Sequence, residues 1–167
     1  MSRHVLRPLP LTPDRFAPYG DVISTTESVV SPMNEARFER FDALARADVD
    51  PDGDVAISIV RSREPTVLPY HFDMVERHPL GSQAFVPLSS FKFVVVVGAP
   101  GESIEPEGLQ AFVTNGHQGV NYHRGTWHMP LLATGTAQSF LVVDRSPMAG
   151  NCEERVFDEA VVLELPD

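Results

Sequence analysis

Short apolar stretches with a two-residue alternation dominate the chain from residue 55 onward. Alternation of this kind is typical of β-strands, whose successive side chains point to opposite faces. Turns rich in glycine, proline and asparagine separate the stretches, as at Asn115-Gly116. The pattern predicts strands over residues 55–61, 70–78, 83–88, 91–97, 109–114, 126–133, 139–144 and 161–165.

Helical signals are confined to the first third of the chain. Residues 34–47 are expected to form one helix, capped by Asn34 and with Phe41 and Leu44 on one side. A shorter helical turn is expected at residues 12–16, where Thr12 can cap the first turn. A βαβ fold would need long helical patterns between its strands. The sequence therefore predicts a single all-β domain, a sandwich or barrel, over residues 1–167.

The composition limits the classes of function. Lysine and arginine number 13 against 23 acidic residues, and the net charge of −10 argues against nucleic acid or an anionic membrane as a partner. No stretch approaches the roughly 18 apolar residues of a membrane span, and the N-terminus lacks the apolar run of a signal peptide. Cys152 is the only cysteine, which fits a reducing compartment, so we expect a cytoplasmic location.

A first group of candidate ligands lies at the end of the strand predicted over residues 70–78. Glu76 and His78 are two residues apart, so they project from the same face of a strand. Phe72 shares their parity and suggests that this face points inward. A buried carboxylate and imidazole must then be paired or bound to a metal. The turn after His78 could return Gln83 to its vicinity, giving a set that suits a first-row divalent metal. The alternative is an exposed pair of strand residues.

A second group follows further along the chain. His123 and His128 flank Gly125, which permits a sharp turn, and Tyr122 and Arg124 adjoin His123. If His128 reaches the first group, a Glu/His/Gln/His cluster closes inside a small barrel. Each histidine could instead be a hydrogen-bonded structural residue.

Three other residues carry chemistry of a different kind. Arg145 ends a predicted strand, where its planar guanidinium could clamp a carboxylate or simply enter solvent. Lys92 is the only lysine and lies beside an apolar strand, which argues against Schiff-base chemistry. Cys152 has no activating base or cation in its sequence neighbourhood, so a nucleophilic role is not expected. We find no glycine motif for nucleotide binding, and expect no nucleotide or organic cofactor.

Several segments resemble the ureidoglycolate lyase family, whose former name is ureidoglycolate hydrolase. The resemblance rests mainly on residues 76–88, residues 115–124 and Trp127-His128, with weaker similarity at residues 11–23 and 140–145. It extends over most of the chain. It implies a cupin-like β-barrel or jelly roll that is typically homodimeric. The implied reaction is the splitting of ureidoglycolate into glyoxylate and urea during allantoin (purine) breakdown.

The resemblance also implies roles for individual residues. Beside the general cupin pattern, Glu76 and His78 take the places of the paired histidines, Gln83 that of the glutamate, and His128 that of the second motif's histidine. The family is associated with nickel or another divalent ion. Because a glutamate replaces a histidine here and a glutamine replaces a glutamate, a metal-free pocket is an alternative.

The implied reaction needs proton transfer and a grip on the substrate carboxylate. We expect His123 or Tyr122 to transfer the proton, and Arg145 or Arg124 to hold the carboxylate. Two other functions are compatible with the same pattern. One is a different cupin enzyme, an isomerase or metal-dependent hydrolase of a small hydroxy acid or sugar acid, and the other is a non-catalytic dimer that binds a metabolite.

Overall fold

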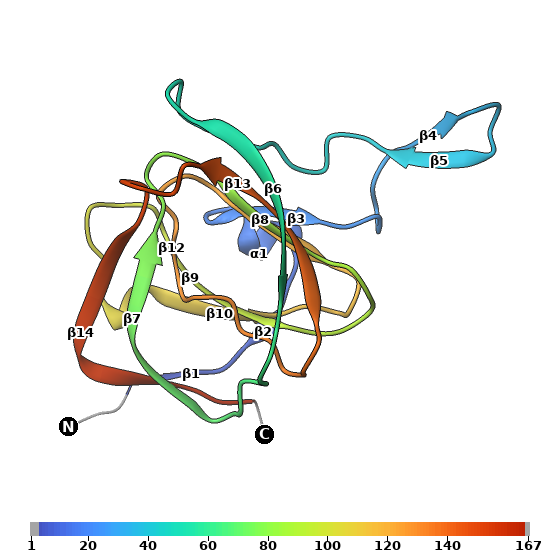
Figure 1. Ribbon diagram of the computed structural model, residues 1–167. Coiled ribbons are helices and arrows are strands. Elements are labelled where there is room, and N and C mark those ends of the chain that lie inside the picture. Colours follow the sequence, from blue (N-terminus) through green and yellow to red (C-terminus); the bar gives the residue numbers. More distant parts are fainter. Residues whose placement is uncertain (1–3, 166–167) are drawn as a thin grey trace.

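Two β-sheets face each other and curl around a common interior in the computed structural model, which describes residues 4–165 (Figure 1). The helices are short: α1 spans Pro13–Phe16 and the 3-10 helix η1 spans Pro106–Gly108. The expected mainly β fold with a short helix near the N-terminus is confirmed. Within the described residues, no helix has the length and apolar character needed to cross a membrane.

The larger sheet has seven strands and curls strongly. Its strands, in spatial order, are β1 (His4–Leu6), β14 (Glu153–Leu163), β7 (Tyr70–Arg77), β12 (Trp127–His128), β9 (Val94–Gly98), β10 (Leu109–Val113) and β2 (Leu9–Pro10). The curl brings β1 into contact with β10. One cluster of apolar side chains, including Val75, Val96 and Trp127, is formed almost entirely by strands of this sheet.

The smaller sheet has five strands. In spatial order they are β3 (Gly20–Ile23), β11 (Gly119–Tyr122), β8 (Gln83–Pro87), β13 (Ser139–Ser146) and β6 (Asp54–Arg61). Phe85, Val120 and Phe140 point from it toward Val95 and Val97 of the larger sheet, and together they form the core between the sheets. Because strand side chains alternate, the residues next to these in sequence face the other side of the smaller sheet, where the segment around Arg46 covers Asn121.

A two-stranded hairpin projects from the body of the molecule (Figure 1). It consists of β4 (Val30–Met33) and β5 (Phe38–Phe41), and we call residues 29–42 the arm. The helix expected over residues 34–47 is therefore wrong. Asn34, Glu35 and Ala36 have positive φ angles of 54°, 58° and 62°, which reverse the chain between the strands. Asn34 tolerates this left-handed conformation, so it acts as a turn residue and not as a helix cap.

The other expected elements mostly hold, with shifted ends. The helical turn after Thr12 is confirmed, since the Thr12 hydroxyl accepts a hydrogen bond from the backbone N–H of Arg15. The last strand, β14, begins at Glu153 and is much longer than the expected 161–165. The strand expected over 126–133 shrinks to β12, because Pro130 has no backbone N–H to continue a ladder. The short strands β1, β2, β3 and β11 were not predicted.

Candidate metal-binding and catalytic site

Glu76, His78 and His128 meet in the interior and form the candidate site. One ligand atom from each lies within 4.8 Å of the other two. Glu76 and His128 meet because they are directly opposed in the pairing of β7 with β12. Their carboxylate oxygen Oε1 and ring nitrogen Nε2 are 3.5 Å apart, and His78 Nε2 is 3.9 Å from the same oxygen. The clustering of these three residues agrees with the expectation from sequence.

The two histidines are held so that one nitrogen of each faces the cluster. His78 Nδ1 is 2.7 Å from the carbonyl oxygen of Asn151, and His128 Nδ1 is 3.0 Å from that of Thr126. A carbonyl only accepts hydrogen bonds, so each Nδ1 carries the proton and each Nε2 presents a lone pair. Both Nε2 atoms are buried and have no hydrogen-bond partner among the described residues.

Unpartnered buried acceptors of this kind fit a metal site. Leaving one polar atom unpaired in the interior costs about 1–3 kcal/mol, so a structure with two of them side by side usually has a use for both. Metal-binding histidines commonly donate their other ring nitrogen to a backbone carbonyl, as both do here. The group Glu76, His78 and His128 could therefore hold a divalent metal ion.

The electrostatics of the cluster favour the protonation states that bind metals. The close His128 side chain, whose Nε2 lies 3.5 Å from the carboxylate, is the main reason that the pKa of Glu76 lies below its usual range, despite the opposing effect of burial. Burial, followed by the nearby His128, lowers the pKa of His78. Glu76 is therefore ionised and His78 neutral at neutral pH, which are the ligand forms of both groups.

The smaller sheet contributes Tyr122 and Gln83 to the same region. The ring of Tyr122 stacks on His128, with centroids 4.5 Å apart and an angle of 18° between the planes. Burial, and then the charge of Glu76, raises the pKa of Tyr122 well above its usual value, so its hydroxyl stays protonated. Gln83 is directly opposed to Tyr122 in the pairing of β8 with β11, and its amide Nε2 lies 3.2 Å from Asp144 Oδ2.

The chain reaches Gln83 by a route that differs from the expected one. After His78 it crosses from the larger sheet to the smaller one, so β7 and β8 are not paired as a hairpin. Gln83 still lies near His78, where its side chain acts weakly on the pKa of that histidine. Glu76 and His78 were expected to be buried because they share the strand face of Phe72, but the face that points inward changes along β7. Phe72 packs in one cluster with Val75, three residues away, near a register shift in the facing strand β14.

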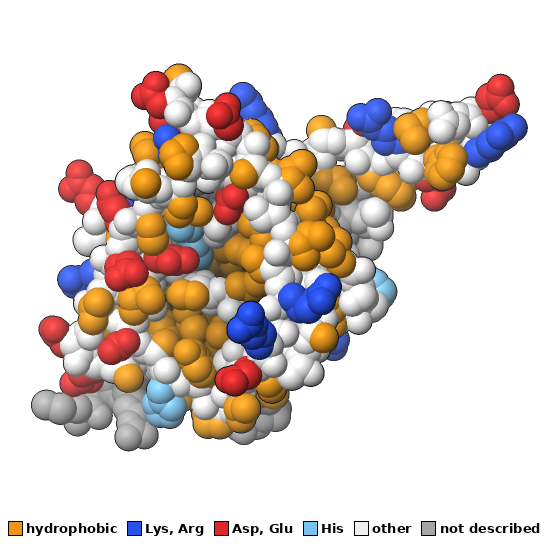
Figure 2. Space-filling view, in the orientation of Figure 1, with side chains coloured by type: hydrophobic (Ala, Val, Ile, Leu, Met, Phe, Trp, Pro, Cys, Tyr) orange, Lys and Arg blue, Asp and Glu red, His pale blue; other side chains and the backbone are white. Residues whose placement is uncertain are grey.

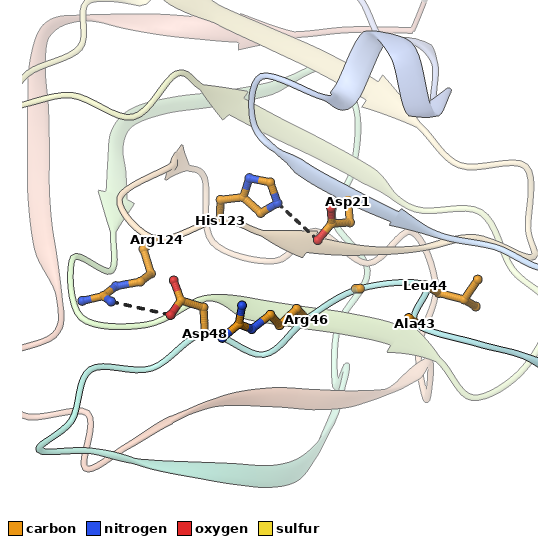
Figure 3. Close-up of a pocket in the computed structure, with 8 residues that line it drawn as sticks. Asp21, Ala43, Leu44, Arg46, Asp48, His123 and Arg124 are labelled. Carbon is orange, nitrogen blue, oxygen red and sulfur yellow. Dashed lines mark ion pairs between the residues drawn. The ribbon is translucent and has the colours of Figure 1, made fainter.

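His123 and Arg124 lie elsewhere. Tyr122 points into the interior, so His123, next in sequence, points to the outer side of the smaller sheet. There its Nε2 is 3.2 Å from Asp21 Oδ2, and Arg124 Nη1 is 3.6 Å from Asp48 Oδ1 (Figure 3). These side chains line an open hollow of about 610 Å³ together with Arg46. The structure does not bring them to the Glu76, His78 and His128 cluster.

Arg145 is engaged in the packing of loops. Its guanidinium is buried and forms an ion pair with both carboxylate oxygens of Asp50, and its Nη1 donates to the carbonyl of Pro147 at 2.5 Å. The same pairing with Arg145 is the main reason that the pKa of Asp50 is lowered. The planar fork of Arg145 therefore holds a carboxylate, as expected for its shape, but that carboxylate belongs to the protein.

Two residues beside the site were not expected there from the sequence. Asn151 is buried, its carbonyl oxygen accepts from His78, and its side-chain oxygen accepts from the backbone N–H of Leu80 at 2.7 Å. The Cys152 thiol lies 3.5 Å from Glu76 Oε2. The spacing along the chain gives no signal for either, because β14 brings them beside β7 from a distant part of the sequence.

Comparisons with known proteins show which family the chain is similar to. The ureidoglycolate lyase family profile matches residues 3–164. A ureidoglycolate lyase of Pseudomonas syringae pv. syringae (strain B728a) is 47% identical over 93% of this chain and 92% of its own length. Those of Pseudomonas aeruginosa (strain LESB58) and Chelativorans sp. (strain BNC1) are 46% and 47% identical, with 93% and 95% of each chain covered.

One solved structure is also similar. A dTDP sugar isomerase from Desulfovibrio desulfuricans G20 aligns over 84% of this chain and 87% of that chain, with a TM-score of 0.44 and 16% identity, and so weak a likeness does not bear on function. The family match and the relatives each cover nearly the whole sequence. The chain belongs to the ureidoglycolate lyase family.

Proposed function

We propose that this protein cleaves ureidoglycolate into glyoxylate and urea without adding water, in allantoin catabolism. The observation that carries the proposal is the buried cluster of Glu76, His78 and His128, with two unpartnered ring nitrogens aimed at one point. The relatives that share its family carry the name of this activity. With this activity the protein is a carbon–nitrogen lyase, and we expect its whole chain, residues 1–167, to form one domain.

The reaction requires two proton movements at one carbon atom. That carbon bears a hydroxyl, a carboxylate and the nitrogen of the urea group. The hydroxyl must lose its proton as the carbon–nitrogen bond breaks, and the departing nitrogen must gain one. Glu76 is ionised and can accept a proton, while Tyr122 is protonated and can donate one. We therefore assign proton transfer to these two groups. His123, which faces the other side of its sheet, has no part in this scheme.

A divalent metal ion fits the donor set, and nickel is the ion that the family resemblance implies. Glu76, His78 and His128 would hold it, with Gln83 as a neutral neighbour. When bound, the ion supplies positive charge for the substrate's carboxylate and hydroxyl oxygens and lowers the pKa of that hydroxyl. Such a charge would take the place of the expected clamp by Arg145, because Arg145 is buried in an ion pair with Asp50.

The test is an assay of purified protein that follows glyoxylate and urea together. Wild-type protein should release the two in equal amounts, and His128→Ala should abolish turnover. His71→Ala is the matched control, since His71 lies on β7 but is exposed and outside the cluster. Near-normal turnover in His128→Ala, or release of only one product, would remove the proposal. Substrates of the other cupin enzymes, tested in parallel, distinguish a lyase from an isomerase or a hydrolase.

The metal and the proton donor have separate tests. Nickel binding, followed by calorimetry on chelator-treated protein, should be lost in His78→Ala and retained in Tyr122→Phe. Tyr122→Phe should lower kcat by about 10²–10⁴-fold, which is the usual contribution of one proton-transfer group. Full turnover in demonstrably metal-free protein would leave only acid–base catalysis. A Tyr122→Phe variant with unchanged kcat would exclude Tyr122 as the donor.

Two further features are proposed from the resemblance and the sequence. The protein is expected to be a homodimer, as is typical of the family, and to act in the cytoplasm. The mass of the purified protein in solution tests the first. Imaging of a tagged copy in the cell tests the second.

A further inference from the structure

We propose that two copies of the chain associate by laying each arm on the outer face of the partner's smaller sheet. This inference deepens the homodimer proposed above and rests on it. It identifies the surface and the pairing of parts, arm to face, that build the dimer.

The part of the smaller sheet's outer face that β6 and β13 form is apolar although it faces solvent. Val55, Ile57 and Ile59 alternate along the edge strand β6, and the side chains of Ile57 and Ile59 are 73% and 63% exposed. In the pairing of β6 with β13, Ile57 lies opposite Val143 and Ile59 opposite Leu141. These residues share one face, which Figure 2 shows as hydrophobic side chains gathered over β6. A sheet with apolar residues on both faces usually has both covered.

The arm also has apolar side chains without a core of its own. Val29 and Phe38 are 85% and 56% exposed, and Val30 and Met33 are exposed as well. Figures 1 and 2 show the arm standing clear of the body, with hydrophobic side chains along it. A two-stranded hairpin alone is marginally stable in water. The arm therefore needs a surface to lie on.

A second copy of this chain is the occupant that the parts favour. The exposed apolar residues of the arm and of the outer face present together roughly 800 Å² per copy, which is the share of one partner in a standard-size interface. A groove lined by Leu44, Val86 and Leu88 joins the base of the arm to the same side of the sheet. One twofold axis would satisfy both surfaces of both copies at once.

Analytical ultracentrifugation of the full-length protein tests the pairing. Phe38→Asp in the arm and Ile57→Lys on the face should each raise the dimer dissociation constant at least about 100-fold, because each leaves an unpaired charge in an apolar contact. Val156→Asp is the matched control, since Val156 is an exposed apolar strand residue of the larger sheet. Circular dichroism checks that each variant keeps its strands.

Mixing the two variants tests which parts meet. If the arm of one copy lies on the face of the other, a mixture of Phe38→Asp and Ile57→Lys forms a dimer with one native contact and one Asp–Lys contact. Arm-to-arm or face-to-face association predicts no such recovery, and its absence overturns the arm-to-face pairing. A monomeric wild type overturns the proposed dimer itself. Dimers that persist in both variants overturn only this surface. None of these results bears on the release of urea, which is assayed separately.

Discussion

Cys152 is placed so that its reactivity reports the charge of Glu76. Cys152 is exposed as a residue, but its thiol is partly shielded from water. This burial, and then the charge of Glu76, raises the pKa of the thiol to about 11. Only the thiolate reacts with alkylating reagents, so the rate should rise about tenfold per pH unit and level off near pH 11. Since this is the only cysteine of the chain, no other thiol contributes.

The same reaction in Glu76→Gln provides the comparison. Removing the negative charge lowers the pKa of Cys152, so alkylation at pH 8 should become faster than in the wild type. Iodoacetamide labelling followed by mass spectrometry measures both rates. A wild-type rate that levels off near pH 9, or a variant with no change in rate, contradicts this account.

Asn151 stabilises the turn that leads from His78 into the smaller sheet. Asn151→Ala should lower the free energy of unfolding by about 1–3 kcal/mol, because it removes the partner of the Leu80 backbone N–H. Asn115→Ala is the control, since the exposed Asn115 makes a similar bond to the backbone N–H of His117. That control should cost less than about 0.5 kcal/mol. Equal losses in urea denaturation would show that Asn151 has no special role.

Residue spacing predicted part of the site and misplaced the rest for a physical reason. Glu76, His78 and His128 were expected to meet, and they do. Tyr122 and His123 were expected in one pocket, but Tyr122 is buried at the end of β11, whereas His123, just beyond it, is exposed and pairs with Asp21. Arg145 was expected at solvent or at a substrate, but it is paired with Asp50. Such a pairing between distant segments has no signal in the local pattern.

Among the elements, the contact between β3 and β11 depends on a missing side chain. A Cβ atom added to Gly20 would overlap the backbone carbonyl oxygen of Asn121, far inside contact distance. Gly20→Ala should therefore separate the two strands and lower stability by about 1–3 kcal/mol or more. Thermal unfolding measures the loss.

Gly101→Ala is the matched control for this substitution. The nearest atom to its added Cβ would be 3.7 Å away, an ordinary contact, so stability should hardly change. If both variants unfold at the temperature of the wild type, β3 is not held as closely as described.

The accuracy of the predicted elements depended on whether local patterns decided them. The strands at β6, β7, β8 and β10 were predicted well because alternation and flanking turns agree there. Residues 34–47, which include the second strand of the arm, were predicted as a helix because Asn34 could cap it and Phe41 and Leu44 have helical spacing. The arm does not pack on the core of its own chain, so the spacing of its apolar residues could not show whether it is a helix or a strand. The short strands β1 and β2 exist only through parallel pairing with distant strands, which local patterns cannot reveal.

At the scale of the whole molecule, the proposed dimer links stability to concentration. If the arm gains its cover only from a partner, dissociation should accompany unfolding, and the unfolding temperature should rise with protein concentration. Differential scanning calorimetry over a hundredfold range of concentration measures the dependence. Phe38→Asp should remove it while leaving the unfolding temperature of the dilute protein nearly unchanged. A wild-type temperature that is independent of concentration contradicts the linkage.

The stacking of Tyr122 on His128 has a consequence for how activity is acquired. The two rings belong to different sheets, and His128 reaches Glu76 only through strands that are far apart in the sequence. The larger sheet supplies Glu76 and His128, but only the packing of the smaller sheet against it adds Tyr122 to the site. Contacts between such distant segments form late, after the entropy of closing long loops has been paid. During refolding, catalytic activity should therefore return together with the final packing of the two sheets, and collapsed intermediates should be inactive.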